Sequence, residues 1–515
     1  MRIRLLELPL ERDEGEYAYA GQLMLQGIPP YETVYTVKFP GTHAAYALII
    51  ALFGESIQAI RIGLLLVNAA TILLMFLLAR RLLDVWAGVV AAATYATLSL
   101  GLAILGQAAH ATHFVVLTAV GGILLLLRAA QTLRPWGLFV SGLLLGLSVL
   151  MKQAGVFFVL FAGLALLMGL LRTPTAAWRR LVAATAFFAL GAAAPLGLTL
   201  LVLWLAGVFE NFWFWTFVYA REYGTIFTLS RGWAQFRLQA GTVMQPAWPL
   251  WTLGAMGVIL LWRDRLARAR WVFFAGFSVF SFLAVCPGFY FREHYFILLL
   301  PAVALLAGAT VTCGARMLAG MRLPAAAWRG VPAIALIAAC GYAVYQDRTS
   351  FFTLSPRDAS RERHSVNPFP ESEAIARYIK SHSDPTHQIA VVGSEPQIYF
   401  LSDRRSATGY IYVYGLMEPQ PYALRMHQEM IREIESARPE FIVYVNVAFS
   451  WLRLPDSPNL IFDWTGQYLE RLYRRVGVID ILSPQHTEYR WDDEAIGYAV
   501  RSPSYLMVFR RKTAA

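Results

Sequence analysis

The chain has 515 residues, of which 57% are hydrophobic and 15% charged, and its mean hydropathy is +0.50. Since a soluble domain carries about 25% charged residues, this composition excludes a soluble globular protein and indicates a polytopic membrane protein. The net charge of +11 does not indicate nucleic-acid binding, because the arginines lie at the ends of apolar segments, where lipid head groups attract them. The three cysteines have neither disulfide nor zinc-ligand spacing.

The first 55 residues precede the long apolar region and contain a cluster of acidic residues. Four carboxylates lie close together: Glu11, Asp13, Glu14 and Glu16. Residues 13–26 are predicted to form a helix, because acids fill the first turn and a Gly and two Pro follow its end. Asp13, Glu16 and Tyr17 then share one helical face. A second short helix is predicted at 42–54, and both helices are expected to lie in the membrane interface.

The opening residues, "MRIRLLELPL", are too short to cross a bilayer, which takes about 20 apolar residues. We therefore expect one more hydrophobic helix upstream of Met1, with these residues as its outer end. An in-frame hydrophobic stretch in the upstream DNA would support this expectation.

Residues 56–346 are predicted to form a transmembrane domain of about ten helices. The predicted spans are 56–82, 86–104, 108–128, 136–151, 154–171, 181–206, 247–262, 271–287, 294–314 and 331–346.

Alternate loops between these spans are rich in arginine, and the opposite loops are nearly free of basic residues. The basic loops contain Arg80 and Arg81; Arg128 and Arg134; Arg172, Arg179 and Arg180; the run "RDRLARAR" (263–270); and Arg316, Arg322 and Arg329. Short basic loops stay in the cytoplasm, so both the N-terminus and residues 347–515 are predicted to lie outside.

Residues 347–515 resemble an ordinary soluble domain of α/β type. Helices are predicted at 366–380, 394–402, 421–439 and around 465–475, and strands in "HQIAVVG", "FIVYVNV", "GVIDIL" and "YLMVFRR". The region contains neither a nucleotide-binding glycine motif nor a catalytic triad. Its expected role is acceptor recognition, a lid over the membrane site, or a structural cap.

The segment "DEGEYAYAGQLMLQGIPPYETVYTVKFPGTHAAYALIIALFGES" resembles the first extracytoplasmic loop of bacterial family 39-type glycosyltransferases. That group is related to protein O-mannosyltransferases and to the aminoarabinose transferase of lipid A, and has the GT-C fold. The resemblance continues through "GLLLGLSVLMKQAGVFF", "FREHYFILLLPAVALLAG" and "VVGSEPQIYFLSDRRSATGY". It implies a multi-pass enzyme of the bacterial cytoplasmic membrane. This enzyme would transfer a sugar from a polyprenyl-phosphate donor to a lipid, glycan or protein acceptor outside.

The resemblance also assigns catalytic carboxylates, since family members place an Asp of the "DE" pair at the active site. That residue corresponds to Asp13, with Glu14 beside it. The chemistry suits a carboxylate, which can take a proton from an acceptor hydroxyl and stabilise an oxocarbenium-like transition state.

Cations are needed to hold the departing phosphate. Only four of the 44 basic residues are lysine, and the two in the membrane half, Lys38 and Lys152, lie on the predicted outer side. A lysine is a compact charge suited to phosphate, although both could instead snorkel at helix ends. Arg292 and His294, in "YFREHYF", are further candidates for the donor phosphate, unless Arg292 simply pairs with its neighbour Glu293.

Other polar residues of the outer loops are candidates for the substrate cavity: Glu16, Tyr17, His110, His113 and Arg221. His110 and His113 are three residues apart, so they could share one helical face and bind a divalent metal. We nevertheless expect no cofactor and no metal requirement, because Val37 stands where the aminoarabinose transferases have a metal-linked glutamate. Thr112 likewise stands where related enzymes commonly carry an acid.

A transporter or flippase for a lipid-linked sugar is the alternative function, and a non-catalytic membrane scaffold is a third. Transporters usually place ionisable groups near the middle of the membrane. In this chain the predicted helix interiors are almost uncharged and the charges gather on one outer face, which favours chemistry at the surface.

Overall fold

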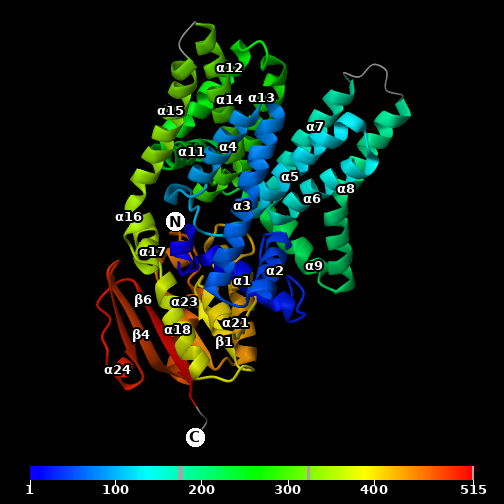
Figure 1. Ribbon diagram of the computed structural model, residues 1–515. Helices are drawn as coiled ribbons and strands as arrows, with labels where there is room; N and C mark the ends of the chain where they lie inside the picture. The colour runs from blue at the N-terminus through cyan, green and yellow to red at the C-terminus, as the bar shows by residue number, and fades with distance from the viewer. Residues whose placement is uncertain (172–177, 322–324, 513–515) are drawn as a thin grey trace.

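The computed structural model describes residues 1–171, 178–321 and 325–512. A tall bundle of helices stands on a smaller part built around a β-sheet, and the N-terminus lies where the two parts meet (Figure 1). The C-terminus lies at the far end of the sheet part. The bundle and the sheet part therefore share a boundary, and the first residues of the chain belong to it.

Three short helices precede the bundle: η1 (Arg2–Leu5), α1 (Arg12–Leu25) and α2 (Gly41–Phe53). A reciprocal capping box fixes the start of α1, since the Glu11 carboxylate accepts from the Glu14 N–H at 3.0 Å and the Glu14 carboxylate from the Glu11 N–H. Gly27, with φ +81°, follows its end. Both helices predicted in this segment are confirmed, each within one residue of its expected ends.

The bundle contains a helix in each of the ten predicted spans. These are α3 (Ile57–Leu82), α4 (Val85–Leu98), α5 (Ala111–Thr132), α6 (Pro135–Met151), α7 (Val156–Leu171), α8 (Trp178–Leu205), α12 (Trp248–Arg263), α13 (Trp271–Val285), α14 (Leu300–Gly320) and α15 (Ala325–Gln346). Among the described residues, seven helical stretches are long and apolar enough to cross a membrane. The chain is therefore a multi-pass membrane protein.

The remaining three apolar helices, α4, α6 and the described part of α15, are shorter than a full span. Helix α4 ends at Leu98 instead of 104, because the chain then turns and the Arg2 guanidinium donates to the carbonyls of Ser99 and Gly106, at 2.9 and 2.8 Å. Helix α6 ends where Lys152 adopts an extended backbone. That all ten helices cross the membrane stays a prediction.

Shorter elements connect the bundle helices. They are η2 (Leu102–Ile104), η3 (Gln153–Gly155), α9 (Phe209–Trp213), the π-helical turn η4 (Phe214–Tyr219), α10 (Ala220–Gly224), α11 (Leu229–Met244), η5 (Gln245–Ala247), η6 (Arg268–Arg270), η7 (Pro287–Phe289) and η8 (Glu293–Leu298). The stretch between the predicted spans 181–206 and 247–262 is thus largely helical.

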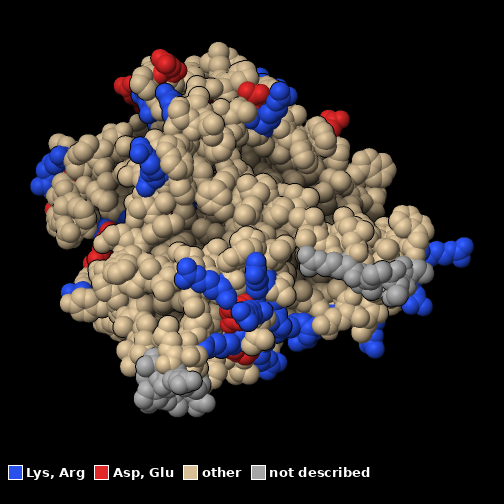
Figure 2. Space-filling view, turned by 90° about the horizontal axis from the view of Figure 1, so that it is seen from above, with Lys and Arg blue, Asp and Glu red and all other residues tan. Residues whose placement is uncertain are grey.

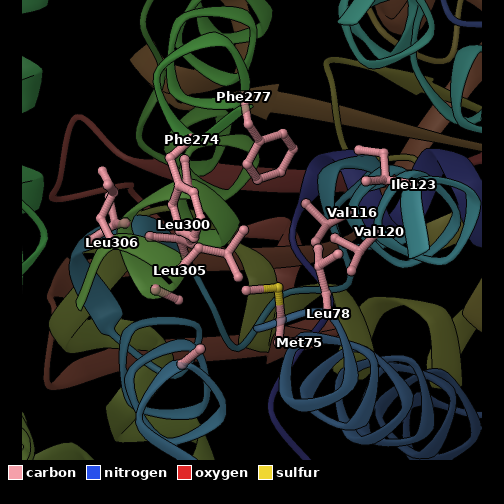
Figure 3. Close-up of a cluster of buried hydrophobic side chains, with 14 of the residues drawn as sticks. Met75, Leu78, Val116, Val120, Ile123, Phe274, Phe277, Leu300, Leu305 and Leu306 are labelled. Atoms are coloured by element: carbon pink, nitrogen blue, oxygen red, sulfur yellow. The ribbon is translucent and has the colours of Figure 1, made fainter. Parts of the chain in front are cut away.

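The interior of the bundle is a continuous apolar cluster (Figure 3). Helices α3 and α5 contribute one side of it, and α13 and α14 contribute the other. Labelled members are Met75, Leu78, Val116, Val120, Ile123, Phe274, Phe277, Leu300, Leu305 and Leu306. This packing holds the ends of the helices, and hence the loops between them, in fixed positions.

Helices α6 and α8 approach each other through glycines. A Cβ added at Gly191 would lie 2.0 Å from the Phe139 carbonyl oxygen, and one added at Gly142 would lie 2.2 Å from that of Phe188. Small residues at such crossings let helix backbones pack closely in a membrane. The contact positions the end of α6, from which Lys152 extends.

We expect Gly191→Leu to lower the stability of the protein by about 1–3 kcal/mol, because the new side chain must push the two backbones apart. The thermal unfolding midpoint in detergent measures this effect. Gly197→Leu on the same helix is the matched control, since nothing lies within 4 Å of a Cβ built there. Equal midpoints for the two variants would contradict the close-packing argument.

In the described part of the chain, the sheet part contains six strands: β1 (Gln388–Val392), β2 (Arg405–Ser406), β3 (Phe441–Asn446), β4 (Tyr473–Ser483), β5 (His486–Trp491) and β6 (Tyr505–Arg511). Their order is β2-β1-β3-β6-β4-β5. Strand β1 pairs in parallel with β2 and β3, and the remaining pairs are antiparallel. The predicted α/β fold is confirmed, with β2 and β5 as strands that the sequence analysis did not predict.

Helices surround this sheet. They are α16 (Arg348–Phe352), α17 (Pro356–His364), α18 (Phe369–Ser381), α19 (Gln397–Ser402), α20 (Tyr414–Met417), α21 (Ala423–Ala437), α22 (Ala448–Trp451), α23 (Leu460–Leu472) and α24 (Asp493–Ile496). Helix α21 is amphipathic and buries Met426, Met430 and Ile434 on one face. All four helices predicted for residues 347–515 are present.

Basic side chains gather at the end of the bundle that faces away from the sheet (Figure 2). Two acids there are paired, since Arg316 bridges Asp84 and Asp264 at 3.1 Å each. The sheet part lies at the end of the bundle opposite this basic end.

Candidate active site

Helix α1 is a polar helix that is buried between the bundle and the sheet part. Its Arg12 donates to Glu395 and to Asn367, both in the sheet part, at 2.7 Å each. Gly15 lies against α19 so closely that an added Cβ would be 2.5 Å from the Gln397 nitrogen. Glycine is therefore required at this contact, and the acids of α1 are held in fixed directions.

Asp13 and Glu16 share one cation. The Lys38 ammonium donates to Asp13 Oδ1 at 2.8 Å and to Glu16 Oε2 at 2.7 Å, and lies 4.4 Å above the Tyr17 ring. Burial opposes ionisation of Asp13, but the surrounding positive groups, Lys38 foremost, together outweigh burial and hold the pKa of this carboxyl well below its ordinary value. Asp13 is thus ionised at neutral pH, and its Oδ2 has no hydrogen-bond donor among the described residues.

Glu14 points to the other side of α1. It is fully buried, binds the Arg61 guanidinium through both carboxylate oxygens and accepts from the Ala109 N–H at 2.6 Å. Arg61 also donates to the carbonyls of Leu8 and Pro9. This network joins α1 to α3 and to the segment before α5.

Two further cations face Asp13. Lys152, at the end of α6, lies 3.4 Å from the centre of the Tyr295 ring, and Arg292 precedes η8. Neither forms an ion pair with any carboxylate of the described residues. Burial lowers the pKa of the Lys152 ammonium to about 7. Both cations are therefore available to an anionic ligand.

These groups line one cavity of about 340 Å³. Asp13, Glu16 and Lys38 form one wall, and the helical stretch after α8 forms a second with Trp215, Thr216, Tyr219 and Tyr223. The third wall comes from the sheet part, with Tyr410, Tyr412, Tyr414 and Glu418. A cavity of this size and lining can hold a small ligand that has both polar and ring surfaces.

Residues 38–204 match the family model of dolichyl-phosphate-mannose-protein mannosyltransferases. This match covers less than half of the chain and confirms the resemblance inferred from its sequence. A search of curated protein sequences finds no match.

Solved structures match nearly the whole chain. ArnT from Cupriavidus metallidurans in the apo state is 16% identical with a TM-score of 0.58, over 96% of this chain and 93% of that one. The same enzyme bound to undecaprenyl phosphate is 15% identical with a TM-score of 0.55, over 98% and 95%. The chain has the GT-C fold. The Archaeoglobus fulgidus oligosaccharyltransferase in complex with Zn and sulfate also matches, at 12% identity and a TM-score of 0.51, over 94% and 69%.

Within this GT-C fold, most of the predicted site residues come together. Asp13, Glu16, Tyr17, Lys38, Lys152, Arg292 and His294 all line the cavity. They come from the segments before α3, after α6 and before α14, so three segments far apart in the sequence converge on one place. His110, which was also predicted to line the cavity, is not part of the lining; its ring is stacked on that of His294, with 3.9 Å between ring centroids.

Three assignments are corrected by the geometry. Glu14 does not line the cavity, because Arg61 and the Ala109 N–H hold it on the opposite face of α1. His113 is buried inside the bundle and does not share a face with His110, because α5 begins only at Ala111 and His110 lies before it in extended backbone. Arg221 is exposed and lies outside the cavity lining.

The tyrosines that the sheet part contributes to this cavity were not predicted from the sequence. Tyr410, Tyr412 and Tyr414 alternate in "GYIYVYG", and Tyr412 lies 5.4 Å from the Lys38 ammonium. Side chains two residues apart in an extended segment point to the same face, so this alternation indicated that the three tyrosines point in one direction. Nothing local indicated that this direction faces α1, more than 390 residues earlier.

Proposed function

We propose that this protein transfers a sugar from a polyprenyl-phosphate donor to an acceptor hydroxyl on the extracytoplasmic side of the bacterial cytoplasmic membrane. The match to a dolichyl-phosphate-mannose-protein mannosyltransferase family supports a lipid-linked donor, as does the fold shared with an enzyme that binds undecaprenyl phosphate. The arginine-rich loops at the end of the bundle away from the sheet part support the extracytoplasmic side for the site, because short basic loops stay in the cytoplasm.

One observation carries the proposal: a single cavity contains an ionised carboxylate with an open oxygen and two cations without carboxylate partners among the described residues. A glycosyl-phosphate transfer needs these groups at opposite ends of the bond that breaks. In this proposal residues 1–55 supply Asp13, residues 56–346 supply the cations, and residues 347–515 cover the acceptor side.

The reaction has a simple balance. The acceptor oxygen bonds to the anomeric carbon while the bond from that carbon to the phosphate oxygen breaks. The acceptor proton passes to Asp13 Oδ2, and the polyprenyl phosphate leaves as an anion beside Lys152 and Arg292. The negative charge of Asp13 also stabilises positive charge on the sugar ring in the transition state.

In this scheme Lys38 does not act mainly as a ligand of the donor phosphate. Its ammonium already bonds two carboxylates, Asp13 and Glu16, and so has less charge to offer a phosphate. In this proposal Lys38 keeps Asp13 ionised and orients the Asp13 Oδ2 atom away from the Lys38 ammonium. The phosphate contacts then fall mainly to Lys152 and Arg292, with His294 beside them.

The proposal predicts that kcat/KM for the donor falls as the pH rises through about 7. The free ammonium of Lys152 has a pKa lowered to about 7, so it is charged below this pH and neutral above it. Loss of one proton reduces kcat/KM about tenfold for each further pH unit. The measurement uses the purified protein in lipid nanodiscs with a panel of polyprenyl-phosphate sugars and envelope extracts as acceptors.

Lys152→Arg is the matched control, because arginine stays charged over this range and should flatten the profile. Lys152→Ala should lower kcat/KM by about 100-fold at pH 6. A wild-type profile that is flat from pH 6 to 9 would contradict the role of Lys152. Passage of intact donor across the bilayer without sugar transfer would favour the flippase.

A further inference from the structure

Glu418 is a carboxylate of the cavity that the proposed reaction does not use. It lies directly after α20, in the wall that the sheet part contributes. Among the described residues, three carboxylates line the cavity, those of Asp13, Glu16 and Glu418. Both oxygens of Glu16 are occupied, since Oε1 accepts from the Thr36 hydroxyl and Oε2 from the Lys38 ammonium, at 2.7 Å each. Asp13 and Glu418 therefore remain as carboxylates that can accept from a ligand.

The Glu418 carboxylate has one bonded oxygen and one open oxygen. Its Oε2 accepts from the hydroxyl of Tyr219, a residue of the second cavity wall, at 2.7 Å. Its Oε1 accepts from no donor among the described residues. Burial raises the pKa of this carboxyl above its ordinary value, and the Tyr219 hydroxyl and the charge of Arg292 oppose the shift only in part. A ligand group that donates to Oε1 would offset part of the cost of this burial.

Contacts behind the cavity wall fix the position of Glu418. The buried His427 ring accepts from the Ile461 N–H at 3.1 Å through Nδ1, so its Nε2 donates to the Leu416 carbonyl at 3.0 Å. The N–H of Glu418 itself donates to the Tyr414 carbonyl at 3.1 Å. An acceptor held in this way is preorganised, because little conformational freedom is lost when a ligand binds to it.

The surroundings of Glu418 suit the ring and the hydroxyls of a sugar. Tyrosines of two walls line the same cavity: Tyr219, Tyr223, Tyr412 and Tyr414. Aromatic rings offer flat apolar surface, and a carboxylate accepts from hydroxyl groups. A phosphate does not suit Glu418, because two anions repel each other.

Arg292 connects Glu418 to the phosphate end of the cavity. Its positive charge acts on the carboxyls of both Asp13 and Glu418. Electrostatic interactions weaken with distance, so these three groups surround one part of the cavity. A sugar whose phosphate is bound by Arg292 then lies within reach of both carboxylates.

We propose that Glu418 is a specificity residue that accepts a hydrogen bond from a hydroxyl of the donor sugar. The inference rests on the proposed function in one respect, namely that the sugar of a polyprenyl phosphate enters this cavity. Lys152 and Arg292 then bind the phosphate of every donor, whereas Glu418 distinguishes a lipid phosphate that carries a sugar from one that does not. No bond forms or breaks at Glu418, so its removal should affect donor binding more than the rate of transfer.

The test measures binding and needs no assay of transfer. The full-length protein, purified in detergent, is titrated by calorimetry with farnesyl phosphate and with the farnesyl-phosphate derivatives of mannose, glucose and galactose. We expect the wild type to bind at least one sugar-bearing lipid more tightly than farnesyl phosphate. The ratio of the two Kd values should fall about tenfold in Glu418→Gln, because the hydroxyl then loses a charged acceptor. The Kd for farnesyl phosphate should stay unchanged.

Glu429→Gln is the matched control. Glu429 also accepts from a tyrosine hydroxyl of the sheet part, that of Tyr410 at 2.8 Å, but it does not line the cavity. Its substitution should leave the Kd ratio as in the wild type. Tyr219→Phe removes the contact between the two walls and keeps the Glu418 carboxylate, so it should keep most of the ratio. A purely structural contact predicts the reverse order, because the amide introduced by Glu418→Gln can still accept from Tyr219.

Deoxy forms of the sugar that binds best identify the hydroxyl. One of them should bind the wild type about tenfold more weakly than the full sugar, and its loss should show no further effect in Glu418→Gln. A Kd ratio that Glu418→Gln leaves unchanged, or that no sugar raises above one in the wild type, overturns the role of Glu418 alone, since binding of farnesyl phosphate still supports the donor site. Absence of binding by farnesyl phosphate and by every sugar-bearing lipid overturns the proposed function as well.

Discussion

Asp13→Asn is expected to reduce sugar transfer by about 100- to 10,000-fold and to leave the protein folded. Asparagine has the same shape and can still accept from the Lys38 ammonium, and Lys38 keeps Glu16 as its second partner. What the substitution removes is the negative charge and the oxygen that takes the acceptor proton. The effect should therefore appear in kcat, measured with saturating donor and acceptor in nanodiscs.

Glu32→Gln is the matched control for this variant. Glu32 is a carboxylate of the same segment between α1 and α2, but it is exposed and does not line the cavity. Its substitution should leave transfer unchanged. Undiminished transfer by Asp13→Asn, with a normal unfolding midpoint, would refute the assignment of the base.

Arg61→Leu is expected to destabilise the protein by about 3–5 kcal/mol, the largest effect on stability that we predict. The Arg61 side chain is 4% exposed and donates to Glu14 and to three backbone carbonyls, those of Leu8, Pro9 and Gln107. Its removal leaves a fully buried carboxylate without its cation. The unfolding midpoint of the variant in detergent gives the measurement.

A double variant separates the buried charge from the lost packing. Arg61→Leu combined with Glu14→Leu should recover part of the stability, because no unpaired charge remains. Arg80→Leu, an exposed position on the same helix α3, should change the midpoint little. A single Arg61→Leu variant as stable as the wild type would contradict the structural role of Glu14.

The sequence predicts the bundle well, because runs of about 20 apolar residues leave few alternatives to a helix in a membrane. The errors lie at the ends, where single contacts decide. Helix α4 stops early because Arg2 binds the turn that follows it. Strand β5, "HTEYRW", escaped prediction because it is a polar edge strand without a buried face.

The site was predictable where one segment carries its residues. Asp13 and Lys38 belong to one segment, residues 1–55, and their side chains meet at 2.8 Å. Glu14 could not be separated from Asp13 by the motif, yet successive helical residues point roughly 100° apart, which sends one side chain into the cavity and the other toward Arg61. The stacking of His110 on His294 depends on the packing of α5 against η8, which no local pattern encodes.

The contact between Arg12 and Glu395 has a consequence for any attempt to divide this molecule. Helix α1 is anchored on one side by Arg61 of α3 and on the other by Glu395, next to α19. The bundle and the sheet part therefore orient Asp13 together. We expect that neither part, expressed separately, would keep the cavity around Asp13 in its present shape. A foreign domain grafted onto the bundle in place of residues 347–515 would have to preserve a glutamate at that junction.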